Sequence, residues 1–189
     1  MVEITDPAVE RTAIDGLLVL RMKQATDERG TVREFFRASA ADELGLTGLG
    51  PWAQVNVTAT TQGGLRGLHA EDMTKLVGVV VGAAFGAYLD LRQGSPTFGK
   101  VVTVPLEPGT QVLVPRGVAN GFQATAPGVS QYLYCFDREW EPGMAGQACN
   151  PLDPTLGIHW PIPVDTTDRA QISQKDLDAP LLADLQEPS

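Results

Sequence analysis

The stretch Phe85-Gly86-Ala87-Tyr88-Leu89-Asp90-Leu91-Arg92 alternates side-chain character with a period of two. Its odd-numbered positions are apolar, whereas positions 88, 90 and 92 carry tyrosine, aspartate and arginine. Successive side chains of a β-strand point to opposite faces, so this alternation is typical of a strand with one buried face.

The same kind of run recurs on both sides of this stretch, with turn signals such as Glu107-Pro108-Gly109-Thr110 in between. Only residues 38–46 favour a helix. Many short strands with almost no helical period predict an all-β sandwich or barrel. The expected strands are residues 16–20, 31–37, 54–60, 75–81, 85–92, 101–106, 111–114, 118–124 and 129–136.

The length of 189 residues suits one domain with a sizeable core. We therefore predict a single domain over residues 1–189, with a core of about 16–140 and a tail of 141–189. The tail is rich in proline and reads as loop, so we expect it to wrap around the body.

Composition narrows the classes of partner. The chain has 14 Lys+Arg against 23 Asp+Glu, a net charge of −9, which disfavours nucleic acid and anionic membranes as partners. It has no apolar run of membrane-spanning length and no signal-peptide pattern at its start. Cys135 and Cys149 are too few for a disulfide framework or a cysteine zinc site. These features predict a cytoplasmic protein with reduced thiols.

The segment Gly63-Gly64-Leu65-Arg66-Gly67-Leu68-His69, continuing to Lys75, contains one of only two histidines in the chain. Histidine has the unperturbed pKa nearest neutrality and is therefore suited to act as a general base. The alternative is a structural histidine that is buried and hydrogen-bonded. Strict alternation puts Arg66 and His69 on opposite faces, so both line one pocket only if the strand bulges, for which Gly67 is the candidate.

Polar side chains within predicted strands indicate a pocket rather than a plain core, because unpaired polar groups are costly to bury. Gln54 and Asn56 share one face of their strand, and Tyr132 and Tyr134 share one face of another. Metal chemistry fits badly, since His69 has no companion ligand pattern and the second histidine, residue 159, lies in the tail. Nucleophile motifs are also absent, which leaves acid–base chemistry with histidine and tyrosine.

Six motifs follow one another along the chain. They are Asp27-x-Arg29-Gly30 with Glu34-Phe35-Phe36; Gln54-x-Asn56; Leu65-Arg66-Gly67-Leu68-His69; Asp90-Leu91-Arg92-x-Gly94-Ser95-Pro96-Thr97-Phe98-Gly99; Val114-Pro115-x-Gly117 running to Gly121-Phe122; and Ser173-x-Lys175-Asp176 with Ala179-Pro180-Leu181. Together, from about residue 16 to 185, they resemble the dTDP-4-dehydrorhamnose 3,5-epimerases of bacterial nucleotide-sugar synthesis. The resemblance implies an all-β, cupin-like jelly-roll barrel with a few short helices and a wrapping C-terminal tail. It also implies a homodimer that needs neither metal nor cofactor.

The resemblance also implies roles for single residues. His69 corresponds to the catalytic base and Asp176 to its partner, while Lys75 corresponds to the lysine near the 4-keto oxygen of the sugar. The acid of the family is a tyrosine six residues before an aromatic-x-Pro; counting back from Trp140 identifies Tyr134. The positions that correspond to contacts with the nucleotide and its diphosphate are Arg29, Glu34, Gln54, Asn56 and Arg66.

Two positions depart from the family pattern close to the expected chemistry. Asn120 stands where a histidine is common, and Trp140 stands where a tyrosine is common. Asparagine still donates a hydrogen bond but shuttles no proton. Taken as a whole, the resemblance implies an epimerase that inverts C3 and C5 of a dTDP-4-keto-6-deoxyhexose to give the L-rhamnose precursor. The alternatives are an epimerase of one carbon, a ketoisomerase on the same fold, and a non-catalytic sugar-nucleotide binder.

Overall fold

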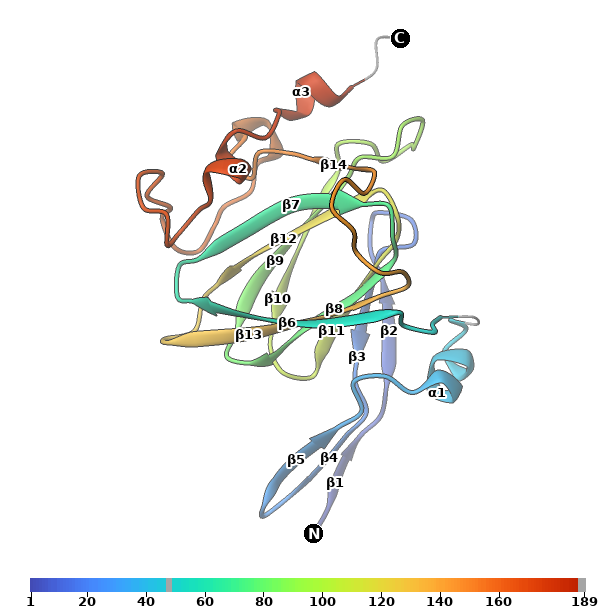
Figure 1. Ribbon diagram of the computed structural model, residues 1–189. Helices are drawn as coiled ribbons and strands as arrows, with labels where there is room; N and C mark the ends of the chain where they lie inside the picture. The colour runs from blue at the N-terminus through green and yellow to red at the C-terminus, as the bar shows by residue number, and fades with distance from the viewer. Residues whose placement is uncertain (47–48, 187–189) are drawn as a thin grey trace.

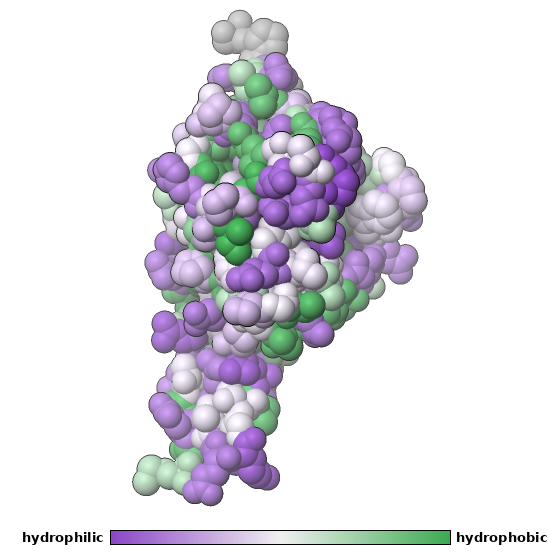
Figure 2. Space-filling model, turned by 90° about the vertical axis from the view of Figure 1, so that its left-hand side faces the viewer, coloured by the Kyte–Doolittle hydropathy of each residue, from purple (hydrophilic) through white to green (hydrophobic). Residues whose placement is uncertain are grey.

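A computed structural model describes residues 1–46 and 49–186, and antiparallel strands make up most of it (Figure 1). A small N-terminal sheet has the order β1-β4-β5. Its strands are β1 (Glu3–Thr5), β4 (Gln24–Asp27) and β5 (Gly30–Arg33). This sheet extends away from the rest of the molecule, and in Figure 2 it forms the narrow lower part.

Two larger sheets form the body of the molecule. The first, with six strands, contains β2 (Ala8–Arg11), β3 (Leu18–Arg21), β11 (Thr110–Val114), β8 (Lys75–Val81), β13 (Val129–Phe136) and β6 (Gln54–Thr61), in that spatial order. The second, with five strands, contains β10 (Val101–Leu106), β9 (Ala84–Asp90), β12 (Val118–Ala124), β7 (Leu65–Glu71) and β14 (Gly146–Ala148).

The chain passes from one large sheet to the other at almost every connection from β6 to β14; β9 and β10, which pair directly, are the exception. This alternation wraps the two sheets around a shared interior, as Figure 1 shows, and gives the predicted jelly roll.

The period of two along each strand decides what faces the interior. On β8, Val77 and Val79 enter the apolar core, and Lys75 lies two residues before them on the same face. On β13, Tyr132 lies fully within this core and Tyr134 packs against it. Cys135 belongs to a separate cluster on the other face. One end of the barrel interior is therefore apolar and the other polar.

The outer faces of both sheets are partly covered. Side chains from the segment around α1 (Ala38–Glu43) pack on the outer face of the six-stranded sheet, among them Phe36 and Trp52. The tail covers the five-stranded sheet, where Leu156 and Trp160 pack against Leu68 and Leu89. Both cysteines are buried and free.

The tail contains more regular structure than its prolines suggest. Besides β14 it forms a 3-10 helix, η1 (Pro154–Leu156), and two short α-helices, α2 (Gln174–Leu177) and α3 (Leu182–Leu185). The Gln123 side chain of β12 holds it through paired hydrogen bonds to the backbone of Ile162, of 2.8 and 2.9 Å. Among the described residues, no helix has the length and apolar character needed to cross a membrane.

Several expected elements have the predicted bounds, namely β8, β10, β12 and β13. Four predictions extended beyond the observed elements. The strand expected over residues 16–20 begins at Leu18, and the strand expected over residues 85–92 ends at Asp90. The strand expected over residues 31–37 ends at Arg33, because the two phenylalanines that follow turn into the outer cluster of the six-stranded sheet. The helix expected over residues 38–46 ends at Glu43, and Gly45 follows with φ +78°.

The motif over residues 90–99, which begins Asp-Leu-Arg, stabilises the chain where β9 ends. The Asp90 carboxylate is fully buried and accepts hydrogen bonds from the Arg92 side chain and backbone and from the hydroxyls of Ser95 and Thr97. Burial alone would raise the pKa of Asp90, but these hydrogen bonds lower it well below its ordinary range. The motif therefore stabilises the turn into β10.

Replacing Asp90 with asparagine should lower the free energy of unfolding at pH 7 by about 2 to 4 kcal/mol, because it breaks a buried charged network. The depressed folded-state pKa means that the stabilisation is present above about pH 4 and is lost as the pH falls further. Urea unfolding of both proteins at pH 7 and pH 3 measures this. Asp165→Asn is the control, since Asp165 accepts similar bonds on the surface; equal losses in the two variants would contradict the account.

Candidate active site

A bulge in β7 places both Arg66 and His69 in one cavity. Opposite β7, Asn120 pairs with His69 and Phe122 pairs with Arg66, so three steps on β7 match two on β12. Gly67 lies within this irregularity with φ +117°, and a Cβ there would come within 2.5 Å of the Gly121 Cα. The bulge predicted at Gly67 is thus confirmed.

His69 is held from behind by the tail. Its Nε2 lies 2.7 Å from Asp176 Oδ1, and the Asp176 side chain is almost fully buried. Burial alone would raise the pKa of Asp176, but hydrogen bonds from His69, Ser173 and the Gly67 backbone lower it. Since an ionised carboxylate only accepts, Nε2 carries the proton and Nδ1 is left as the basic nitrogen.

The short helix α2 gives Asp176 its position. Ser173 caps the helix by accepting a hydrogen bond from the Asp176 backbone nitrogen at 3.1 Å. The backbone nitrogen of Leu65 on β7 donates to Gln171 at 2.6 Å just before this cap. The tail is therefore fastened to the strand that carries His69.

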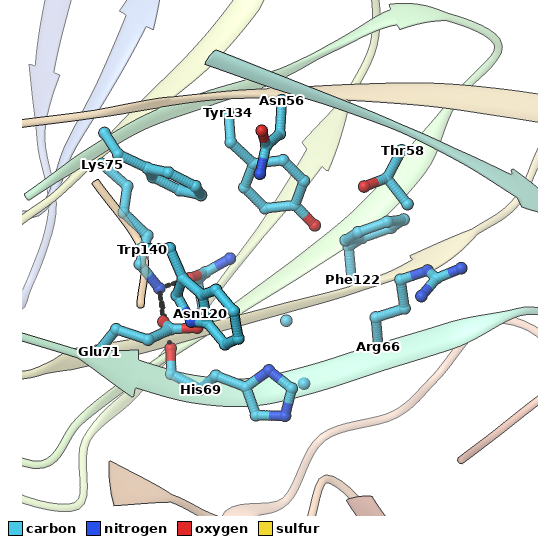
Figure 3. A pocket seen from close by; sticks show the side chains of 13 residues that line it. Asn56, Thr58, Arg66, His69, Glu71, Lys75, Asn120, Phe122, Tyr134 and Trp140 are labelled. Carbon is cyan, nitrogen blue, oxygen red and sulfur yellow. Dashed lines mark hydrogen bonds and ion pairs between the residues drawn. The ribbon is translucent and has the colours of Figure 1, made fainter. Parts of the chain in front are cut away.

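Lys75 occupies the polar end of the barrel interior and is only 3% exposed. Its ammonium donates to Asn120 Oδ1 at 2.7 Å, to the His69 carbonyl at 3.2 Å and to the Glu71 carboxylate (Figure 3). Burial lowers the pKa of Lys75, and the negative charge of Glu71 opposes this shift. The buried Lys75 and the partly exposed Glu71 form an ion pair beside the histidine.

Tyr134 faces the cavity from the opposite sheet. Figure 3 shows it extending from β13 toward the space above His69, which lies on β7. Its ring contacts Tyr132 and Phe136, with centroids 4.7 and 5.7 Å away. Burial raises the pKa of Tyr134, so the phenol keeps its proton at neutral pH. A histidine with a basic nitrogen and a protonated tyrosine thus flank one space.

The cavity has a volume of about 260 Å³. Near its mouth, Gln54 Oε1 accepts from the Trp140 backbone nitrogen at 2.7 Å, and Gln54 Nε2 donates to Asn56 Oδ1 at 3.1 Å. Gln54 therefore connects β6 to the loop that carries Trp140. The lining residues are Asn56, Thr58, Arg66, Gly67, His69, Glu71, Lys75, Asn120, Gly121, Phe122, Tyr134, Phe136 and Trp140.

A second cavity of about 320 Å³ adjoins the first and shares its His69 and Tyr134 walls. Arg66 of β7 also lines both cavities, while Arg169 and Lys175 of the tail line the second. Three cationic side chains thus gather beside the histidine of a chain with a net charge of −9. Within residues 1–46 and 49–186, no group of three or more histidine, cysteine or acidic side chains is placed to hold a metal ion.

Comparison with known proteins places the chain in a family. The model of the family described as dTDP-4-dehydrorhamnose 3,5-epimerase matches residues 11–184. The chain belongs to this family. Its members are isomerases, and the epimerase of Salmonella typhimurium is 34% identical over 92% of this chain and 94% of its own length.

Solved structures of the family share the fold. The Legionella pneumophila dTDP-6-deoxy-D-glucose-3,5-epimerase, in complex with dTDP-4-keto-L-rhamnose, has a TM-score of 0.83 and 33% identity, covering 97% of this chain and 100% of that one. ChmJ, a 3′-monoepimerase from Streptomyces bikiniensis in complex with dTDP-quinovose, has a TM-score of 0.80 and 31% identity, covering 92% of this chain and 87% of that one. Epimerases of two carbons and of one therefore both resemble this chain.

The structure gathers most of the residues that the sequence predicted for the site. The first cavity contains Asn56, Arg66, His69, Lys75, Asn120, Tyr134 and Trp140, with Asp176 behind the histidine and Gln54 at the mouth. Two predicted residues lie elsewhere. Arg29 pairs with Asp27 at the tip of the N-terminal sheet, and Glu34 pairs with Arg37 beside α1.

Sequence reasoning missed Glu71, Phe122, Arg169 and Lys175 as residues of the two cavities. Once the bulge is known, the alternation along each strand puts Glu71 on the same face as His69, and Phe122 on the same face as Asn120. The tail cations reach the site only through the packing of residues 165–176, for which no local pattern exists. The one available signal was the basic residue in the Ser-x-Lys-Asp motif itself.

Proposed function

We propose that the protein epimerises a dTDP-4-keto-6-deoxyhexose by proton transfer between His69 and Tyr134. His69, polarised by Asp176, removes a proton from a carbon next to the 4-keto group, and Tyr134 returns a proton to the opposite face. The keto group makes that proton removable, since the negative charge passes to its oxygen as an enolate. The observation that carries this proposal is the His69–Asp176 pair facing a protonated tyrosine across one cavity.

The second cavity suits the diphosphate of the substrate. Arg66 and Arg169 bring guanidinium groups, which suit phosphate oxygens, to its wall, and Lys175 adds a third cation. The terminal nitrogens of Arg169 also donate to the carbonyls of Ile172 and Thr166, which holds this side chain in place. The Legionella relative in complex with dTDP-4-keto-L-rhamnose supports a dTDP-sugar as the ligand. The positive charge of these three side chains thus makes the second cavity favourable for an anion, although the net charge of the chain is negative.

We assign inversion at both C3 and C5, which yields the precursor of L-rhamnose, and keep inversion at one carbon as the second candidate. The relatives named as 3,5-epimerases support the first reading. The second is favoured by the likeness to the Streptomyces 3′-monoepimerase and by Asn120 and Trp140, which replace common residues of the family in the cavity wall. Stereochemical analysis of the product distinguishes the two.

The two proposed proton carriers should fail differently. His69→Asn should lower proton removal by roughly 10²- to 10⁴-fold, the contribution expected of a general base. Tyr134→Phe should still exchange the substrate proton from the His69 side in D2O but lose inverted product. Proton NMR of dTDP-4-keto-6-deoxyglucose reports both exchange and configuration.

The exposed second histidine supplies the control, because His159→Asn leaves the cavity unchanged. Binding of dTDP by each variant, followed by calorimetry, shows that the fold is retained. Normal exchange in His69→Asn, or normal product from Tyr134→Phe, would contradict the assignment.

We also propose a homodimer in which each N-terminal sheet reaches the other copy. Arg29 and Glu34 match nucleotide-contacting positions of the family, yet they lie outside the cavity of their own chain. The sheet that carries Arg29 projects from the body and exposes Ile4 and Val32 (Figure 1). A second copy accounts for both features.

Light scattering after gel filtration should therefore give twice the 20.2 kDa chain mass. Arg29→Ala should raise KM while leaving kcat within about threefold. The lost contact binds the nucleotide equally in the ground state and the transition state, and the reacting groups are unchanged. A monomeric protein with full activity would refute the shared site.

A further inference from the structure

The Lys75 ammonium has no proton left to offer a substrate. An ammonium carries three N–H donors, and here they meet three acceptors: the His69 carbonyl, the Glu71 carboxylate and Asn120 Oδ1. The side chain is also nearly inaccessible, with 3% of the residue exposed. For Lys75 to reach a sugar oxygen directly, it would have to abandon one of these partners.

Lys75 in turn decides how the Asn120 amide is oriented. Because an ammonium only donates, the atom that faces it at 2.7 Å must be the amide oxygen. The amide nitrogen, Nδ2, is then directed into the cavity, as Figure 3 shows. Asn120 is buried, at 6% exposure, and in the described part of the chain Nδ2 has no hydrogen-bond partner.

An amide donor on a nearly buried residue, without a protein partner and open to the cavity, is poised for a ligand acceptor. We propose that Asn120 is the catalytic residue that donates from Nδ2 to the 4-keto oxygen, and that Lys75 and Glu71 are positioning residues behind it. This assignment rests on the proposed function. It differs from the role that family resemblance implies for the lysine.

The chemistry balances without a proton from Asn120. The substrate C–H bond breaks, its proton goes to His69 Nδ1, and the electron pair moves through the carbonyl to the 4-keto oxygen. The oxyanion accepts a hydrogen bond from Asn120 Nδ2, whose dipole is aligned by the Lys75 charge on the amide oxygen. When a proton is returned to the carbon, the carbonyl forms again and the amide is unchanged.

Asn120→Ala separates this assignment from direct donation by lysine. The substitution removes the amide donor and at the same time frees one Lys75 proton. If Asn120 is the donor, kcat for substrate proton exchange in D2O should fall on the order of 10²- to 10³-fold, as for other oxyanion donors. The Kd for dTDP, which lacks the sugar, should stay within about twofold. If Lys75 is the donor, kcat stays within about threefold of wild type, and the assignment is overturned.

Two further variants fill the same space and guard against a folding failure in Asn120→Ala. Asn120→His, the common residue of the family, keeps a donor and should retain exchange within about tenfold. Asn120→Asp keeps Lys75 paired but has no donor at neutral pH, and should lose exchange as Asn120→Ala does. Equal rates for these two variants would overturn the assignment. A wild-type protein that binds dTDP but exchanges no proton would refute the proposed function instead.

Discussion

The hydrogen bond between His69 Nε2 and Asp176 Oδ1 joins two residues that lie 107 positions apart in the chain. One belongs to a strand of the barrel and the other to a single-turn helix in the tail. The bond fixes the proton of the imidazole on Nε2 and leaves Nδ1 as the basic nitrogen. Two further contacts help to keep Asp176 beside His69. The hydrogen bonds of Gln123 to Ile162 and of Leu65 to Gln171 hold the returning tail against β12 and β7.

The site and the core use the same strand faces. On β8 the inward positions run from Lys75 into Val77 and Val79, and on β13 they run from Tyr134 into Tyr132. A barrel built in this way has rigid walls, so its polar groups are placed by backbone register rather than by mobile loops. The cost of burying Lys75 is offset by three acceptors, and this arrangement leaves the neutral amide of Asn120 as the free donor.

Much of this could be predicted from the sequence. Strand periodicity identified β8, β10, β12 and β13, and ordered motifs identified His69, Tyr134 and Asp176. The bulge at Gly67 was predicted from a conflict between strand parity and a shared pocket.

Other features have no signal in the local sequence and are seen only in the structure. The strand β14 is only Gly-Gln-Ala and exists because it pairs with β7, and α2 depends on one serine cap. The ion pair of Glu71 with Lys75 likewise follows from the turn between β7 and β8, which brings the end of one strand beside the start of the next.

The central claim is that this cavity removes and returns protons beside a sugar ketone. Its most direct test is proton NMR of dTDP-4-keto-6-deoxyglucose incubated with the wild-type protein in D2O. We expect deuterium to appear at both C3 and C5, with the configuration of each carbon inverted in the product. If deuterium appears at neither carbon, from protein that still binds dTDP, the claim is contradicted.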